Sequence, residues 1–384
     1  MGTDAWGIDD GWWSNDGHWH QPPAESIAAI RAAMGADSPD ATPPSGPPLW
    51  FVDAGSGPAL HGPATVAIED GMAELQVEGH LPADLPLGVH HLHPHDGGPT
   101  TTLFVTPTSI PRAPERRWGA IVQLYASRST RSWGIGDLAD LRTVGRWLAD
   151  LGGSVLGVNQ LGDVLPTSPR QASPYSPSAR DHLDPLWIDV ERLGAPGTVG
   201  QRAANGPLVD RDAAWTAKRA ALAAAFAAEG SPNAAPDDLH AVFCALAEHH
   251  GAGWPAWPRP LHDPHGDAVR RFAQEHAEAG GFWAGVDRIA DDQFASTRDE
   301  LAGRGVALLG DLTVGVDPAG YDAWCNQHVL ALGVGVGAPP DTFNPAGQNW
   351  GLPPFDPWAL RAAAYRPFRA VVQRSLARYG GLRI

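Results

Sequence analysis

From residue 118 onward, hydrophobic residues follow two different patterns in turn. Residues 118–125 (WGAIVQLY) form a nearly continuous apolar run, which is typical of a strand buried in a parallel sheet. Residues 137–151 repeat apolar side chains every three or four positions, which predicts an amphipathic helix with Asp137 as its N-cap and Gly152 as its end. Residues 154–158 form a second apolar run. Strand, helix and strand in succession make a βαβ unit, so the sequence predicts an α/β fold.

The same patterns continue to the last residue. A third apolar run covers residues 306–312, a weaker fourth covers 332–336, and residues 380–384 look like the start of another strand. A long segment separates the second run from the third. It holds a strand-like run at 186–190 and helical patterns near 211–229, 236–250 and 285–302, and a later helical pattern covers 360–379.

The N-terminal part of the chain differs in composition and in its hydrophobic pattern. Residues 1–45 are rich in Trp and His and contain one helical pattern at 23–35, so we expect an N-terminal helical segment there. Residues 46–112 hold short, partly alternating runs separated by Gly, Pro and Asp, and predict a small antiparallel β-domain. Residues 110–114 are typical of a linker, so we assign residues 113–384 to the α/β region.

Composition and charge narrow the possible functions. The net charge is −16, from 27 basic and 43 acidic residues, and such an acidic surface disfavours binding to nucleic acid or to anionic membranes. No run of 18 apolar residues is present and the acidic N-terminus does not resemble a signal peptide, so we expect a cytoplasmic protein. The two cysteines, Cys244 and Cys325, are too few for a disulfide scaffold or a four-cysteine zinc site. Lys218 is the only lysine.

Two motifs point to cofactor or metal chemistry, and each has a simpler explanation. Residues 134–139 match the G-x-G-x-x-A pattern of dinucleotide-binding sites, but the preceding strand ends about nine residues too early and no acidic residue ends the next strand. We interpret these glycines as a turn that leads into a helix. Residues 90–96 contain four histidines that could bind a metal, although exposed histidines on a hairpin explain them better. Four tryptophans are interpreted as packing residues rather than sugar platforms: Trp254, Trp257, Trp283 and Trp324.

Five groups of motifs in the α/β region together resemble one family, the amylomaltases, which are the 4-α-glucanotransferases of glycoside hydrolase family 77. In chain order they are SWGIGDL (132–138), SPYSPSAR (173–180) with DPLWID (184–189), GDLTVGV (310–316), GAPPDTFNPAGQNWG (337–351) and GLRI (381–384). Each motif is modest alone, but their common order makes the match specific. The N-terminal part resembles the extra domain of actinobacterial-type members.

The resemblance implies an incomplete (β/α)8 TIM barrel with inserted helical subdomains, preceded by a small N-terminal β-rich domain. Active sites of such barrels lie at the carboxyl ends of the strands. Asp311 ends the third apolar run, the loop that holds Asp341 follows the fourth run, and Arg383 lies in the last run. The motifs therefore follow the barrel rule.

The resemblance also implies a retaining transfer of α-1,4-glucan segments between maltooligosaccharides, without metal or organic cofactor. One carboxylate attacks the anomeric carbon, and a second protonates the leaving oxygen and then activates the acceptor. In the family the nucleophile is the Asp of an Arg-x-Asp motif, and Arg383 and Ile384 match its first two positions. We therefore expect an Asp at the next codon of the gene. We also expect residues 1–384 alone to be an inactive fragment without nucleophile or acid/base.

Six residues are expected to contact the glucan, and one to orient the nucleophile. The substrate-binding residues are Tyr175, Asp311, Asp341, Phe343, Gln348 and Trp350, and Arg383 would orient the nucleophile through a charge-assisted hydrogen bond. The family tends to have an Asp at the position that we align with Ala319, so Asp317 or Asp322 is a candidate substitute. The alternative role of Asp322 is to cap a helix at 323–332.

Two alternatives stay open at this point. The chain could be a non-catalytic, truncated α-glucan-binding protein that retains the sugar contacts. It could also be a gene fragment without a stable fold, because an incomplete barrel leaves strand edges unpaired. The expected partners are maltooligosaccharides and other α-1,4-glucans, with no nucleic acid and no membrane.

Overall fold

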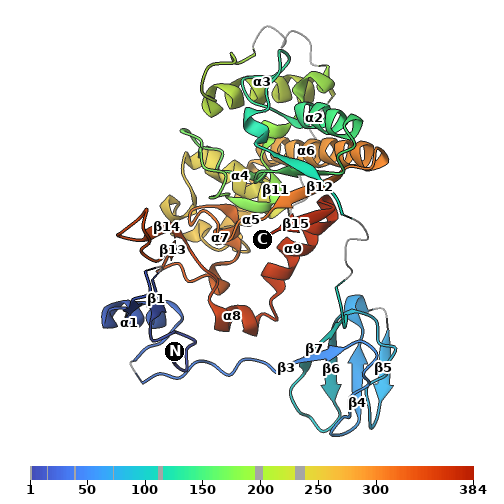
Figure 1. Cartoon of the computed structure of the whole chain (residues 1–384), viewed down its shortest axis with the longest axis vertical. Coiled ribbons are helices and arrows are strands. Elements are labelled where there is room, and N and C mark those ends of the chain that lie inside the picture. Colours follow the sequence, from blue (N-terminus) through green and yellow to red (C-terminus); the bar gives the residue numbers. More distant parts are fainter. Residues whose placement is uncertain are drawn as a thin grey trace. The chain divides into compact units, whose positions relative to one another are not determined.

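The computed structural model describes residues 2–14, 16–38, 40–71, 73–110, 116–194, 202–229 and 238–384 (Figure 1). The chain divides into two compact units. The first contains Met1–Trp12, His20–Arg116 and Phe355–Arg366, and the second contains Trp13–Trp19, Arg117–Pro354 and Pro367–Ile384. Most of the expected linker at 110–114, and with it the expected boundary between residues 112 and 113, lies outside the described residues.

The first unit contains a five-stranded sheet in the order β3-β7-β6-β4-β5. Its elements are β3 (Leu49–Asp53), β4 (Ala64–Ala67), the 3₁₀ turn η1 (Glu69–Gly71), β5 (Glu74–Val77), β6 (Gly88–Pro94) and β7 (Thr101–Thr106). Val66, Leu92 and Leu103 belong to its buried core. Neighbouring strands are antiparallel except β3 and β7, which run parallel. The sheet is therefore mixed, where the sequence predicts an antiparallel one, because alternation reports a buried face and not the direction of the neighbouring strand.

The first unit also includes elements from both ends of the chain. Helix α1 (Ala24–Ala33) forms where the pattern at 23–35 predicts it. The short helix α8 (Pro357–Ala362) clusters with this unit, and Trp358 Nε1 donates a hydrogen bond to the carbonyl oxygen of Trp6 at 3.2 Å. The residues of a small hairpin, β1 (Trp12–Trp13) and β2 (Trp19–His20), are divided between the two units in the same clustering.

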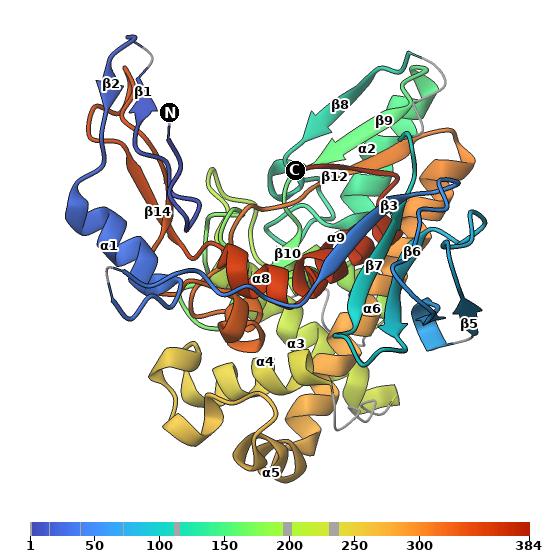
Figure 2. The same ribbon diagram turned by 90° about the horizontal axis from the view of Figure 1, so that it is seen from below.

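The second unit contains a four-stranded parallel sheet in the order β15-β12-β9-β8. Its strands are β8 (Gly119–Val122), β9 (Val155–Val158), β12 (Ala307–Asp311) and β15 (Gly381–Arg383). Figure 2 shows β8, β9 and β12 side by side, with helix α2 (Leu138–Asp150) next to them. Asp137 is the N-cap of α2, as predicted, because its Oδ1 accepts hydrogen bonds from the backbone N–H groups of Ala139 and Asp140. The βαβ unit and the α/β fold class are confirmed.

Further helices and short turns complete the second unit. The helices are α3 (Arg211–Glu229), α4 (Leu239–His250), α5 (Asp267–Glu275), α6 (Ala277–Gly303), α7 (Tyr321–Cys325) and α9 (Arg366–Arg378). The 3₁₀ turns include η2 (Leu124–Ala126), η6 (Trp254–Ala256), η7 (Arg259–Leu261) and η8 (Gln327–Val329). Gly145 of α2 packs so closely on Leu301 of α6 that an added Cβ would lie 2.5 Å from the leucine methyl groups. Within the described residues, no helix has the length and apolar character needed to cross a bilayer.

Three predicted segments fold differently. The fourth run, at 332–336, does not join the parallel sheet; the chain there forms an antiparallel hairpin, β13 (Val336–Ala338) and β14 (Gln348–Leu352). The run at 186–190 forms the 3₁₀ turns η3 (Pro185–Trp187) and η4 (Val190–Leu193). The helix at 360–379 is interrupted at Ala364 and Tyr365, whose φ angles are 51° and 56°. Short apolar runs indicate burial but do not select the element that is buried.

Candidate active site

The carboxyl ends of β12 and β15 bring Asp311 and Arg383 together. Arg383 donates hydrogen bonds from Nε to Asp311 Oδ1 at 2.7 Å and from Nη2 to Asp311 Oδ2 at 2.5 Å. The strand register sets this pair, because Asp311 lies opposite Arg383 in the parallel ladder. The hydrogen bonds to Asp311 raise the pKa of the Arg383 guanidinium above its ordinary value. The pair is therefore a bidentate, charge-assisted contact with a fixed orientation.

A pocket of about 150 Å³ opens around this pair, at the ends of all four parallel strands. Its polar lining residues are Gln123, Asn159, Tyr175, Asp311 and Arg383. Asn159 is buried, and its Oδ1 accepts a hydrogen bond from the Leu124 backbone N–H at 2.7 Å. The sequence motifs alone do not indicate Gln123 and Asn159 as site residues. Each directly follows a strand, Gln123 after β8 and Asn159 after β9, which is where a parallel barrel places its site residues. Only Asn159 also follows the end of an apolar run in the sequence, since Gln123 lies within the run at 118–125.

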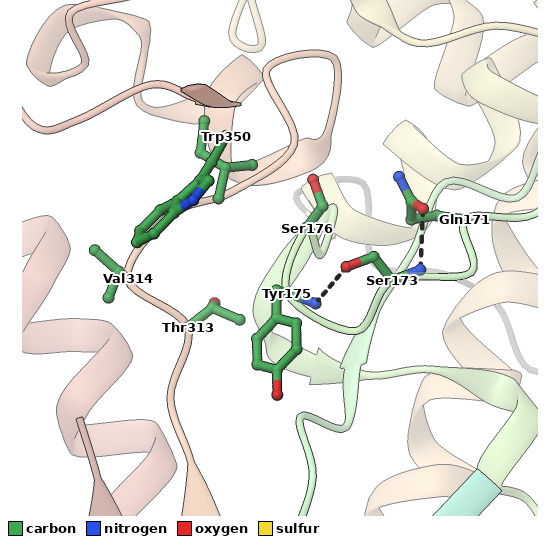
Figure 3. Close-up of a pocket in the computed structure, with 9 residues that line it drawn as sticks. Gln171, Ser173, Tyr175, Ser176, Thr313, Val314 and Trp350 are labelled. Atoms are coloured by element: carbon green, nitrogen blue, oxygen red, sulfur yellow. Dashed lines mark hydrogen bonds between the residues drawn. The ribbon is translucent and has the colours of Figure 1, made fainter. Parts of the chain in front are cut away.

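Tyr175 lies on the loop between the short strands β10 (Gly162–Asp163) and β11 (Ala179–Leu183). Two hydrogen bonds shape this loop: Ser173 Oγ accepts from the Tyr175 N–H at 3.3 Å, and Gln171 Oε1 accepts from the Ser173 N–H at 3.0 Å (Figure 3). The tyrosine is exposed and lines both the strand-end pocket and a larger cleft. It therefore connects the Asp311–Arg383 pair to that cleft.

The larger cleft has a volume of about 600 Å³. One part of its lining comes from the Tyr175 loop, and another from Thr313, Val314 and Gly315, which follow β12. Strand β14 adds Trp350, and Figure 3 shows this indole beside Val314, across the cleft from Tyr175. A mostly apolar cleft with aromatic rings and a few polar groups suits a ligand that presents both C–H faces and hydroxyl groups, as a sugar does.

The β13–β14 hairpin holds four of the predicted glucan contacts, two in its loop and two on β14, but only one of these four lines the cleft. Asp341 shapes the loop, since its Oδ1 accepts hydrogen bonds from the N–H groups of Phe343 at 2.8 Å and Asn344 at 2.6 Å. Gln348 Oε1 accepts a hydrogen bond from Trp350 Nε1 at 3.0 Å. Trp350 lines the cleft, whereas Asp341, Phe343 and Gln348 line neither the cleft nor the strand-end pocket.

Asp317 and Asp322, the candidate substitutes for the family carboxylate, also lie outside the lining of both cavities. Asp322 is buried within α7, and Arg180 Nε donates a hydrogen bond to its Oδ2 at 2.8 Å. The N-cap of α7 is Gly320, so the predicted capping role of Asp322 is wrong. Asp317 Oδ1 accepts a hydrogen bond from the Ala319 N–H at 2.8 Å, and burial raises the pKa of its carboxyl group. Both carboxylates stabilise local structure.

The glycine motif forms the helix-entry turn that the sequence predicts. Gly134 has a φ of 83°, which favours glycine, and a Cβ on Gly136 would lie 2.0 Å from the carbonyl oxygen of Leu124. Both glycines are therefore required by the backbone of the turn that leads to Asp137 and α2.

The four tryptophans are packing residues, as predicted. The histidines at 90–95 differ in exposure, so the prediction that they are exposed holds for only some of them. Trp254, Trp257, Trp283 and Trp324 are buried, and each donates a hydrogen bond from Nε1 to a protein oxygen. His91 is exposed, but His90 is buried in the sheet and its Nδ1 accepts a hydrogen bond from the Glu69 N–H at 3.0 Å. Where the structure describes the chain, potential metal-ligand clusters occur, but none of them includes residues 90–96.

Comparisons with known proteins address the family directly. The sequence model of the 4-alpha-glucanotransferase family matches residues 122–384, which is well over half of the chain. The chain belongs to this family. The resemblance to amylomaltases is thereby confirmed.

Individual relatives agree with this assignment. The 4-alpha-glucanotransferase of Mycobacterium tuberculosis (strain H37Rv) is 39% identical over 344 residues, which cover 79% of this chain and 48% of the relative. The enzyme of the same name from Haemophilus influenzae is 28% identical over 334 residues, covering 73% of this chain and 47% of the relative. The chain thus spans about half the length of these relatives.

Two solved structures share the fold. The amylomaltase from Corynebacterium glutamicum aligns with a TM-score of 0.76 at 24% identity, covering 98% of this chain and 63% of that chain. The amylomaltase from Streptococcus agalactiae in complex with acarbose aligns with a TM-score of 0.61 at 17% identity, covering 70% and 59%.

Proposed function

We propose that the chain forms part of a 4-α-glucanotransferase that transfers α-1,4-glucan segments between maltooligosaccharides, and that the cleft between Tyr175 and Trp350 binds the glucan. The observation that carries the proposal is that Tyr175 lines both this cleft and the pocket around Asp311 and Arg383, at the carboxyl ends of parallel strands. Family membership, and the acarbose complex of the S. agalactiae amylomaltase, support an oligosaccharide ligand.

In this proposal the four parallel strands are consecutive strands of a (β/α)8 barrel. Their order in the sheet is their order in the chain, and helices lie in each connection, which is the arrangement found in such barrels. The helices α3 to α5, between β9 and β12, would then be the inserted helical subdomain. The fold shared with the C. glutamicum amylomaltase supports this arrangement.

The proposed reaction proceeds with retention, which needs a nucleophilic carboxylate and an acid/base carboxylate. The amylomaltase resemblance assigns the nucleophile to the residue after Ile384. In a strand, residues two positions apart point to the same face, so that carboxylate would share a face with Arg383. Arg383, already hydrogen bonded to Asp311, would orient it and keep it ionised. Residues 1–384 alone would then bind glucan without transferring it.

The test compares residues 1–384 with a longer polypeptide that continues into the following codons of the gene. Glucose release from maltotriose is expected only from the longer polypeptide, in preparations free of the host enzyme, because removing a covalent nucleophile costs several orders of magnitude in rate. Both polypeptides are expected to bind acarbose with similar Kd, measured by tryptophan fluorescence. Glucose release by residues 1–384 would contradict the assigned nucleophile, and failure of both folded polypeptides to bind acarbose would contradict the cleft.

The alternative is a non-catalytic α-glucan-binding protein. One observation favours it: the described residues that line the cleft all lie between Gln171 and Leu352, so the cleft itself does not include Arg383 or the residue after Ile384. Acarbose binding by both polypeptides with glucose release by neither would select this alternative.

A further inference from the structure

A cluster of buried side chains with metal-binding groups lies apart from the cleft. Asp163 is at the end of β10, and His240 and Cys244 are on α4. The exposed fractions of the three residues are 2%, 5% and 1%, and none of them lines the cleft or the strand-end pocket. We propose that Asp163, His240 and Cys244 bind a Zn²⁺ ion. The amylomaltase resemblance implies no metal, so this site would be an addition to it.

The distances between the three ligand atoms fit a tetrahedral zinc site. His240 Nε2 lies 3.2 Å from Asp163 Oδ2, and Cys244 Sγ lies 3.8 Å from that oxygen and 3.7 Å from that nitrogen. Ordinary Zn–O, Zn–N and Zn–S bonds at tetrahedral angles place such atoms about 3.3–3.6 Å apart. An ion among the three atoms would therefore need shifts of only a few tenths of an ångström. A water molecule would occupy the fourth coordination position.

Local structure explains how the ligands meet. His240 and Cys244 are four residues apart, so they lie one turn apart on the same face of α4. Asp163 faces them from β10, where it pairs with Ala179 of β11. The combination of carboxylate oxygen, imidazole nitrogen and thiolate sulfur in a tetrahedral arrangement favours Zn²⁺ over Mg²⁺ or Ca²⁺, which take oxygen ligands.

Charge also favours a bound ion. Zn²⁺ with one carboxylate, one thiolate and one neutral imidazole has no net charge, which suits a fully buried position. Without a metal, an ion pair between Asp163 and His240 would require a cationic ring. The Nδ1 atom of His240 is buried and has no hydrogen-bond partner among the residues that the structure describes, so a cationic ring would carry an unpaired N–H group there. Zinc at Nε2 leaves the ring neutral and reduces this cost.

A second layer of side chains orients the histidine ligand. The His182 ring stacks on the His240 ring with centroids 3.7 Å apart and planes 12° apart, and His182 Nδ1 lies 3.0 Å from Asp287 Oδ1. His182 belongs to β11, which lies beside α4 in Figure 1. The ion would therefore join α4 to the base of the β10–β11 hairpin, whose loop holds Tyr175 in the cleft. The stacked His182 ring restrains the plane of the His240 ring.

The first experiment measures the zinc content of the full chain by inductively coupled plasma mass spectrometry. The protein is purified without chelators or a metal-affinity tag. About one zinc per chain is expected. Removing it with a chelator should lower the midpoint of thermal unfolding, and adding Zn²⁺ should restore it. Zinc at less than about one tenth of an equivalent, both as purified and after incubation with Zn²⁺ and gel filtration, would overturn the proposal. This measurement needs no variant, so it stands even where a variant fails to fold.

Replacement of zinc by Co²⁺ then identifies the ligands. A thiolate-to-cobalt absorption band is expected, and Cys244→Ala should remove it while Cys325→Ala should leave it unchanged. Cys325 is the matched control because the chain has only these two cysteines. Circular dichroism checks that both variants are folded. A band that survives in folded Cys244→Ala would overturn the proposal.

His182, His240 and Asp287 form a second possible ligand group that shares His240. Asp163→Asn and Asp287→Asn separate the two groups. Loss of bound metal in Asp163→Asn with retention in Asp287→Asn is expected. The opposite result would place the ion in the other group and overturn the assignment.

Discussion

Two regions of the second unit use residues of the family motifs in opposite ways. Asp137 and Asp189, from SWGIGDL and DPLWID, are buried and meet charged partners. Tyr175 and Trp350, from the neighbouring motifs, are 56% and 45% exposed and line an open cleft. A motif residue can therefore build the scaffold of a site or contact its ligand. Burial distinguishes the two roles, and a motif by itself does not.

The buried region is organised around Lys218. Its Nζ donates hydrogen bonds to the carbonyl oxygens of Leu186 and Ile188, each at 2.7 Å, and lies 3.5 Å from Asp137 Oδ2. Arg131 lies 3.0 Å from Asp137 and 3.3 Å from Asp189. Burial lowers the pKa of Lys218 and raises the pKa of the Asp189 carboxyl group, and the opposite charges counteract both changes. The network thus connects α3, the cap of α2 and the segment after β11.

The largest effect is expected for Lys218→Met, which retains most of the stem and removes the charge. The free energy of unfolding should fall by about 3 kcal/mol, near the lower end for breaking a buried ion pair, because Asp137 keeps its contact with Arg131. Urea unfolding followed by circular dichroism measures the change. A loss below about 0.5 kcal/mol, the range of an exposed pair, would remove the contrast between the two regions.

A second measurement tests the same point in the unchanged protein. Lys218 is the only lysine, so acetic anhydride at low dose can modify only the N-terminal amine and this side chain among the amino groups. Lys218 is completely buried, and it should resist acetylation until the protein is unfolded. Peptide mass spectrometry reports the modified site. Acetylation of Lys218 at the same rate in native and urea-unfolded protein would contradict its buried position.

A pair of matched aspartates gives an intermediate effect. Asp137 and Asp341 each accept two backbone hydrogen bonds through Oδ1, but Asp137 is buried at the start of α2 and Asp341 lies on the β13–β14 loop. Asp137→Ala should lower the free energy of unfolding by about 2 kcal/mol, the upper range for a helix cap, because Lys218 also loses a charged neighbour. Asp341→Ala should cost less than about 1 kcal/mol. Equal losses in urea unfolding would show that burial does not set the difference.

The elements with strong local patterns could be predicted from the sequence. Strands β8, β9 and β12 follow from continuous apolar runs, and the cap of α2 follows from Asp137 before an amphipathic repeat. The β13–β14 hairpin was missed, because its short run near residue 336 gives no information about which strand it pairs with. The interruption of the helix at Ala364 and Tyr365 was also missed, since neither residue type signals a positive φ.

Only some of the residues that line the two cavities could be predicted from the sequence, and none of their contacts could: Gln123 and Asn159 were missed. Asp311 and Arg383 were identified one by one from motifs, yet their mutual hydrogen bonds depend on the register of strands 72 residues apart. The Asp163–His240 contact joins residues 77 positions apart, and only the spacing of His240 and Cys244 left a local signal. Side-chain exposure could not be predicted either, because the sequence does not distinguish Trp350, which lines the cleft, from Trp324, which is buried in the core. Long-range pairing and burial are properties of the assembled fold.

The smallest effects on stability are expected for substitutions near the cleft, where binding and stability should change independently. Trp350→Ala should weaken acarbose binding about fivefold, which corresponds to about 1 kcal/mol of lost ring contact, and change the free energy of unfolding by less than about 0.5 kcal/mol. Phe343→Ala is the matched control from the same hairpin: Phe343 is 92% exposed and does not line the cleft, so its removal should change Kd less than twofold. For both variants, isothermal titration calorimetry with acarbose measures Kd, and urea unfolding measures the free energy of unfolding. A large loss of stability in Trp350→Ala with unchanged affinity would place Trp350 with the scaffold. A larger effect on binding from Phe343 than from Trp350 would show that the β13–β14 loop closes over the bound glucan and brings its tip into contact.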